Sequence, residues 1–210
     1  MKKAKSKDAI PNATRRKIEI EFLYVDLTVC SRCKGTDANL DEALTEVSRI
    51  LEAAGVEVSV RKILVESEDQ AKALGFFSSP TIRINGKDIA LEFRESRCDS
   101  CEACAGDSGP VNCRVWVFQG KEYTEAPKAM IVDAILREIY GGASSQKPPA
   151  RSHKLREVPE NLRRFFSGKA AITAKKESSC CPPTEESSCC APSEKAACCG
   201  ASDSKGCGCT

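Results

Sequence analysis

The pattern of apolar and polar residues predicts a strand, a helix and a second strand at the start of the chain. The segment from Ile18 to Leu27 begins with alternating apolar and polar residues and ends with a more continuously apolar run. This pattern is typical of a strand that enters a sheet interior. Aliphatic residues then recur at helical spacing, at Leu40, Leu44, Val47, Ile50 and Leu51. Gly55 fits the end of that helix, and alternation resumes over 56–65, which predicts the second strand.

Similar patterns continue to about residue 142. They predict a short helix over 67–74, a strand over 81–85, a second hairpin strand over 88–93, a strand over 115–118 and a closing helix over 129–140. The dipeptide Asn85-Gly86 is typical of a hairpin turn, and Gly75 is typical of a helix end. This order of elements predicts an α/β domain with helices on both faces of a mixed sheet.

The composition changes beyond residue 142, where we expect a linker over 143–170 and a disordered tail over 171–210; residues 1–16 should be flexible. From about residue 168 the chain has too few large apolar residues to offset the entropy of ordering it. Within the linker, the pattern predicts a short helix that begins near Pro159 and presents Leu162, Phe165 and Phe166 on one face. That face either packs back on the core or docks a partner protein.

Composition adds one anomaly, because fourteen of the 210 residues are cysteine. Six lie between residues 30 and 113 and eight between 180 and 209, so two separate roles are expected. The chain is long enough for an ordinary core, and its N-terminus lacks the apolar stretch of a secretory signal. We therefore expect a cytoplasmic protein whose thiols serve redox chemistry or metal binding. The near balance of 32 Lys+Arg and 30 Asp+Glu gives no case for nucleic acid, and no apolar run predicts a membrane span.

The first cysteine pair, Cys30 and Cys33, follows the first predicted strand and precedes the first long helix. A Cys-x-x-Cys in this context is the signal for a redox dithiol, with Cys30 as the candidate catalytic nucleophile and Cys33 as the resolving thiol. A helix N-terminus and the flanking Arg32 and Lys34 would lower the pKa of Cys30. If the helix begins only near Ala38, most of that activation is lost. A ligand pair for a metal or metalloid and plain structural thiols are the alternatives.

A second group consists of Cys98, Cys101, Cys104 and Cys113, which lie in a Cys-rich insertion over 94–113. Four thiolates this close in sequence can enclose Zn²⁺ tetrahedrally, so the first expectation is a structural zinc site. Three alternatives stay open: redox-active or disulfide-forming thiols near the Cys30 site, capture of a soft metal, and an iron–sulfur cluster.

The tail contains a nine-residue repeat of adjacent cysteines. Its members are Cys180, Cys181, Cys189, Cys190, Cys198 and Cys199, and the series closes with Cys207 and Cys209. Consecutive Cα atoms lie about 3.8 Å apart, below the usual disulfide range of about 4.4–6.8 Å, so each pair should stay reduced or bond to another repeat. Flexible vicinal thiols suit Cu(I), Hg(II) or trivalent arsenic. The alternative is a low-complexity tail without a metal role.

Another motif stands before the third predicted strand, where Ser78-Ser79-Pro80-Thr81-Ile82 follows a short helix. Together with Cys30-Ser31-Arg32-Cys33, it resembles the thioredoxin superfamily over about 18–139. The chain is most similar to a prokaryotic thioredoxin-like family catalogued only as a domain of unknown function. The resemblance implies a thioredoxin-like fold over 17–142, with Pro80 as a cis-proline that faces the dithiol and shapes a docking surface; it implies no established reaction. The tail resembles those of proteins encoded near arsenic and heavy-metal resistance systems.

Other chemistries find no support in the sequence. His153 is the only histidine and lies in the linker, and no glycine-rich motif predicts a nucleotide cofactor. These features favour a thioredoxin-like protein that carries out thiol–disulfide or thiol–metalloid exchange, linked to soft metal or arsenic handling. The alternative is a metal- or metalloid-binding chaperone or sequestration protein without turnover. The sequence does not decide whether the protein is an enzyme.

Overall fold

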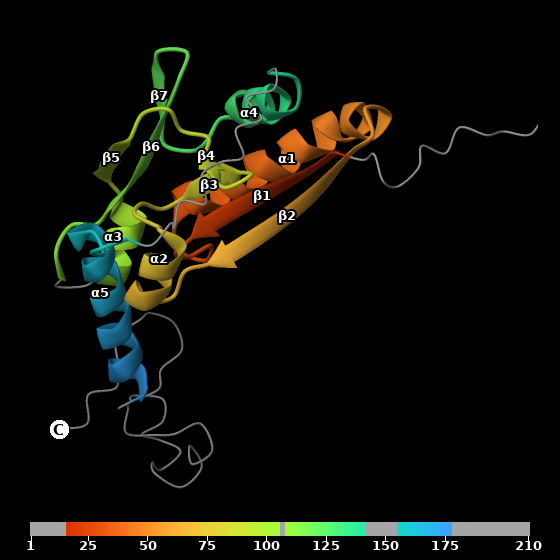
Figure 1. Ribbon diagram of the computed structural model, residues 1–210. Coiled ribbons are helices and arrows are strands. Elements are labelled where there is room, and N and C mark those ends of the chain that lie inside the picture. The colour runs from red at the N-terminus through yellow and green to blue at the C-terminus, as the bar shows by residue number, and fades with distance from the viewer. Residues whose placement is uncertain (1–15, 106–107, 142–154, 178–210) are drawn as a thin grey trace, which may run out of the picture.

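A mixed four-stranded sheet, in the order β2-β1-β3-β4, forms the centre of the domain (Figure 1). The computed structural model describes residues 16–105, 108–141 and 155–177. Strand β1 (Arg16–Tyr24) pairs in parallel with β2 (Val56–Leu64) and antiparallel with β3 (Thr81–Ile84), and the short β4 (Lys87–Asp88) pairs with β3. The predicted mixed α/β class is confirmed.

Helices α1 (Ser31–Ala53) and α4 (Lys128–Tyr140) cover one face of this sheet. Alternate residues of β1, among them Ile20 and Phe22, are fully buried against them, as the sequence alternation predicts. We call this cluster the α1–α4 core; its buried members include Ile18, Ile20, Phe22, Leu40, Val47, Ile82, Trp116, Ile131 and Ile135.

A second cluster lies beyond the carboxyl end of β1, on the side to which Leu23 and Val25 point. It includes residues of α2 (Glu68–Leu74), a helix that begins after Ser67 and ends at Gly75 as predicted. We call this cluster the thiol-side core; its buried members include Leu23, Val25, Cys30, Cys33, Val65, Phe76, Cys98, Cys101, Cys113, Leu162, Phe165 and Phe166.

A separate antiparallel sheet consists of β5 (Arg94–Arg97), β6 (Asn112–Phe118) and β7 (Lys121–Tyr123), with α3 (Asp99–Ala105) between β5 and β6. The predicted hairpin strand over 88–93 is wrong, because β4 ends at Asp88. The Asp88 carboxylate accepts the N–H of Ala90 at 3.0 Å and pairs with buried Arg114 at 2.8 Å. The N–H of Ile89 still donates to the carbonyl of Ile82 at 3.1 Å, and the Asp88 contacts accompany the turn of the chain that follows.

Helix α5 (Glu160–Glu177) packs on the domain instead of standing free (Figure 1). Leu162, Phe165 and Phe166 are buried in the thiol-side core, so the first alternative for this face, packing on the core, is confirmed and the face is not free for a partner. The helix continues to Glu177, so the prediction of disorder from about residue 168 is wrong for residues 168–177.

Gly168 explains why this helix packs so closely in spite of its polar composition. A Cβ at this position would lie 2.2 Å from the backbone oxygen of Ala105, at the end of α3. The glycine therefore permits a backbone contact between α5 and α3 that a side chain would block. The predictions for residues 1–15 and for the cysteine-rich tail over 178–210 lie outside the described residues.

Candidate metal centre

Four cysteine side chains, one at residue 30 and three within residues 98–113, meet in the thiol-side core. They are Cys30, Cys98, Cys101 and Cys113, and their sulfur atoms all lie within 4.8 Å of one another. None of the four residues is more than 3% exposed, and all four are free thiols. We call these residues the thiol cage.

Cys30 reaches the cage from the first turn of α1. It is the N-cap residue, and its Sγ accepts the N–H of Cys33 at 3.3 Å. Because α1 begins at Ser31, the alternative in which the helix starts near Ala38 is wrong. The exposed N–H groups of a helix N-terminus favour negative charge on a sulfur in this position.

The other three thiols come from the insertion over 94–113, which contains β5, α3 and the start of β6. Cys98 precedes α3 and its carbonyl accepts the N–H groups of Cys101 and Glu102, so the first turn of α3 places Cys98 and Cys101 side by side. Cys113 lies on β6, opposite Ser96 of β5. The sulfur atoms of Cys101 and Cys113 are 3.3 Å apart, which is a contact between thiols and not a disulfide bond.

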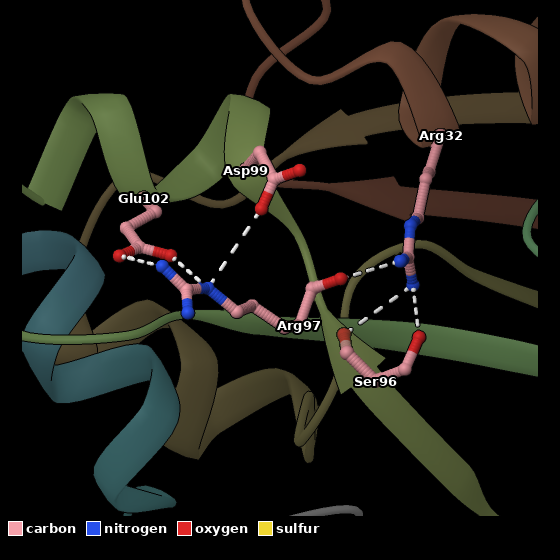
Figure 2. Close-up of polar contacts among 5 residues, drawn as sticks. All are labelled: Arg32, Ser96, Arg97, Asp99 and Glu102. Atoms are coloured by element: carbon pink, nitrogen blue, oxygen red, sulfur yellow. Dashed lines mark hydrogen bonds and ion pairs between the residues drawn. The ribbon is translucent and has the colours of Figure 1, made fainter.

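Arg32 joins the two parts of the cage. Its guanidinium donates to the hydroxyl of Ser96 at 3.0 Å and to the carbonyl of Arg97 at 2.6 Å (Figure 2). A further hydrogen bond reaches the carbonyl of Cys113 at 3.3 Å. Arg97 in turn pairs with Glu102 of α3. Arg32, one of the two residues between Cys30 and Cys33, thus contacts the backbone beside Cys98 and Cys113, a role that was not predicted from the sequence.

The size of the cage fits a single metal ion. Four bonds of about 2.3 Å from a tetrahedral ion to sulfur place the sulfur atoms about 3.8 Å apart. Separations below 4.8 Å are therefore close to the size needed. An iron–sulfur cluster has several iron and sulfide atoms between its cysteines and needs a wider cage, so the geometry does not favour this alternative.

Helix α5 covers the thiol-side core. Besides its buried apolar residues, Lys169 pairs with Asp26 in the loop between β1 and α1 at 2.9 Å. Burial raises the pKa of Asp26, but hydrogen bonds from Thr28 and Lys169 outweigh it and lower the pKa to about 2. The ion pair therefore ties α5 to the segment that leads to Cys30.

Cys33 lies next to the cage but is not one of its four members. Its side chain is fully buried and its Sγ is 3.2 Å from the hydroxyl of Ser79, which also accepts the N–H of Val25. The Ser79-Pro80 peptide bond is cis, as the resemblance implied for Pro80. The predicted pair Cys30 and Cys33 is thus brought together, beside Pro80.

Hydrogen bonds among the thiols of this region lower the pKa of some of them and raise the pKa of others. Hydrogen bonds from Cys101 and Cys113, followed by those from Cys33 and Cys98, lower the pKa of Cys30. Hydrogen bonding to Cys30 and burial raise the pKa of Cys33. Hydrogen bonds from Cys101 and Cys113 lower the pKa of Cys98 to about 7. A thiolate on Cys30 is therefore stabilised by its neighbours, as a metal ligand or a nucleophile requires.

The sequence analysis placed Cys30 in a redox pair and Cys104 in the metal set, and the structure changes this grouping. Cys30 joins Cys98, Cys101 and Cys113, so the insertion thiols lie near the Cys30 site, as one alternative expected; their redox activity or disulfide formation stays a prediction. The side chain of Cys104 and the eight tail cysteines lie outside the described residues. The spacing of the cysteines alone gave no signal that Cys30 belongs with the insertion, because the contact depends on the tertiary fold.

Further findings concern membrane spans and the similarity of the chain to known proteins. None of the helices that the structure describes is long and apolar enough to cross a membrane. In comparisons with known proteins, the family described as a domain of unknown function (DUF2703) matches residues 18–135. No curated protein and no solved structure gives a match.

Proposed function

The chain belongs to the DUF2703 family of domains of unknown function, and from the geometry of the thiol cage we propose that it binds one thiophilic metal ion. The observation that carries this proposal is the convergence of four buried thiols within 4.8 Å. They come from the start of α1, the start and body of α3, and β6. Four free thiols this close together supply the four sulfur ligands of a closed tetrahedral metal site.

The donor set indicates which ions fit. All four ligands are sulfur, and thiolates select Zn²⁺, Cu(I) and heavier thiophilic ions over Mg²⁺ or Ca²⁺. Four protein ligands close a tetrahedral site and leave no position for substrate. Zinc is the ion we propose first. Its fourth ligand in this proposal is Cys30, in place of Cys104, which was expected from the sequence.

Burial favours holding an ion over turnover. Cys30, the candidate nucleophile, has no exposed surface, and α5 covers the core that contains it. A large substrate cannot reach this sulfur while α5 is in place. We therefore favour the alternative of a metal-binding or sequestration protein, in which the tail thiols collect soft ions, trivalent arsenic included, beside the folded domain.

Thiol–disulfide or thiol–metalloid exchange is the second candidate. It is supported by the N-cap position of Cys30, its contact with Cys33, and Pro80 beside them. The strand order β2-β1-β3-β4 is consistent with the thioredoxin-like fold that the resemblance implies. Because Cys30 cannot bond to an ion and to a second sulfur at once, this candidate applies to the ion-free protein.

The test is metal analysis of the full chain with its eight tail cysteines replaced by serine, purified without oxygen. We expect one thiophilic ion per chain by elemental analysis and native mass spectrometry. Cys113→Ser should lose it, since three thiolates remain, whereas Cys33→Ser, a matched change of a buried cysteine outside the cage, should retain it. Absence of the ion, or equal retention in both variants, would contradict the proposal.

A further inference from the structure

We propose that peroxide oxidises Cys30 and Cys33 to a disulfide. Cys30 is then no longer a thiolate ligand of the thiol cage, and the bound ion is released. The inference rests on the proposed metal site and adds its regulation. It follows from the fact that one sulfur, that of Cys30, belongs both to the cage and to the Cys30–Cys33 pair.

The geometry brings the two thiols together before any oxidation. Cys30 caps the helix that carries Cys33 in its first turn, and the N–H of Cys33 donates to Cys30 Sγ at 3.3 Å. One helical turn places such residues within the Cα separation of about 4.4–6.8 Å that disulfides require. The hydroxyl of Ser79, fixed by the N–H of Val25, contacts Cys33 Sγ at 3.2 Å and holds it in place.

Cys33 is also the thiol that stays available when the cage holds an ion. Among the cysteines whose side chains the structure describes, it alone stands outside the cage. In the loaded protein the four cage sulfurs are bonded to the ion, so an oxidised Cys30 meets Cys33 as its nearest free partner.

The oxidant is a peroxide, which is small enough to enter a core that excludes larger disulfides. The thiolate sulfur of Cys30 attacks one oxygen of hydrogen peroxide, the O–O bond breaks, and hydroxide leaves, which gives a sulfenic acid. The sulfur of Cys33 then attacks Cys30, and the sulfenic oxygen leaves as water with the Cys33 proton. The two sulfurs lose two electrons and the peroxide gains them.

The consequence for the ion is the loss of one of four ligands. A neutral disulfide sulfur is a poor ligand compared with a thiolate, so the ion is left with Cys98, Cys101 and Cys113 in a site that is no longer closed. Reduction by a dithiol restores the fourth ligand. Peroxide would thus convert a stored ion into a free one, and the conversion would be reversible.

The experiment uses the full chain with the eight tail cysteines replaced by serine, loaded with Zn²⁺. Hydrogen peroxide is added in equal amount, release is followed with a chromogenic zinc chelator, and disulfides are mapped by peptide mass spectrometry. We expect one released ion for each Cys30–Cys33 disulfide. Cys33→Ser, which keeps a hydrogen-bonding group toward Ser79 and all four ligands, should release zinc at least tenfold more slowly.

The outcomes separate the two proposals. Equal release from Cys33→Ser would overturn the inference. A disulfide between Cys101 and Cys113, whose sulfur atoms already lie 3.3 Å apart, would also overturn it, and this result does not depend on the variant. A reduced chain that binds zinc but keeps it under peroxide would contradict only the release step. A reduced chain that binds no zinc would contradict the metal site itself.

Discussion

The α1–α4 core and the thiol-side core are both buried, but they consist of different kinds of side chain. Ile20, Phe22 and Ile131 of the first cluster are aliphatic or aromatic side chains that need only contact with one another. The second cluster contains five thiols, and four of these form the thiol cage. The first core needs only contacts between apolar side chains. In the second core, the cage sulfurs can in addition bond to a metal ion. The comparison predicts that the two regions respond differently to the same treatment.

Removal of the ion should produce the largest difference. A structural ion in a site made of thiolates contributes on the order of 10 kcal/mol to the folded form. Chelation of the loaded chain should therefore increase amide hydrogen exchange in α3 and β5 strongly, while α1 and α4 change little. Hydrogen exchange with mass spectrometry checks this at peptide level. Equal increases in amide exchange in both cores would show that the ion does not stabilise the thiol-side core selectively.

A pair of substitutions on β1 compares the cores directly. Ile20 and Leu23 are both fully buried, but they point into opposite clusters. Ile20→Ala and Leu23→Ala should each lower the free energy of unfolding by about 2–5 kcal/mol, because each leaves a cavity. Only Leu23→Ala should accelerate release of the ion, measured by transfer to a chromogenic chelator. Equal acceleration by both would mean that the ion responds to global stability alone.

Gly168→Ala tests the contact between α5 and α3. Helix propensity alone would make this change stabilising by about 1 kcal/mol. The new Cβ would lie 2.2 Å from the backbone oxygen of Ala105, so we expect a loss of about 1–3 kcal/mol instead. Ser167→Ala, at an exposed neighbouring position, is the control and should be neutral or slightly stabilising. Urea denaturation measures both, and a stabilising Gly168→Ala would contradict the close approach.

The ion pair between Asp26 and Lys169 should give the smallest effect and a dependence on pH. The pKa of Asp26 lies at about 2, below its ordinary value of 3.8, so its contribution is complete above pH 4 and is lost as the pH falls through 2. Because Lys169 is partly exposed, we expect Asp26→Asn to cost only about 1 kcal/mol at neutral pH. Urea unfolding of both forms should show this difference shrinking between pH 4 and pH 2. If the difference in unfolding free energy stayed constant with pH, it would come from packing and not from the ion pair.

The same contrast explains which parts of the fold could be predicted from the sequence. The α1–α4 core consists of long elements with clear periodicity, and β1, β2 and α4 were predicted within a few residues; the start of α1 was left open between the Cys30 motif and Ala38. Strand β5 reads Arg-Glu-Ser-Arg and has no apolar alternation, so its pairing with β6 was not visible. Gly168 was read as part of a disordered segment because its role depends on Ala105, which is far away in the sequence.

In the candidate site, too, local features were predicted from the sequence and contacts between distant segments were not. Each cysteine of the cage was recognised as a candidate for chemistry, yet Cys30 was assigned to a separate role from Cys98, Cys101 and Cys113. Spacing predicts groups of ligands only when they lie on one local segment, as Cys98 and Cys101 do. The approach of Cys30 depends on the hydrogen bonds of Arg32 to the backbone of Arg97 and Cys113, which no local pattern contains.

X-ray absorption spectroscopy at the metal edge tests the central claim most directly. The sample is the zinc-loaded full chain whose tail cysteines are replaced by serine. We expect four sulfur neighbours at about 2.3 Å, whereas the Cys30→Ser variant prepared in the same way should not retain the ion, because only three thiolates remain in it. Four sulfur neighbours in both proteins, or nitrogen and oxygen neighbours in the first, would contradict the claim.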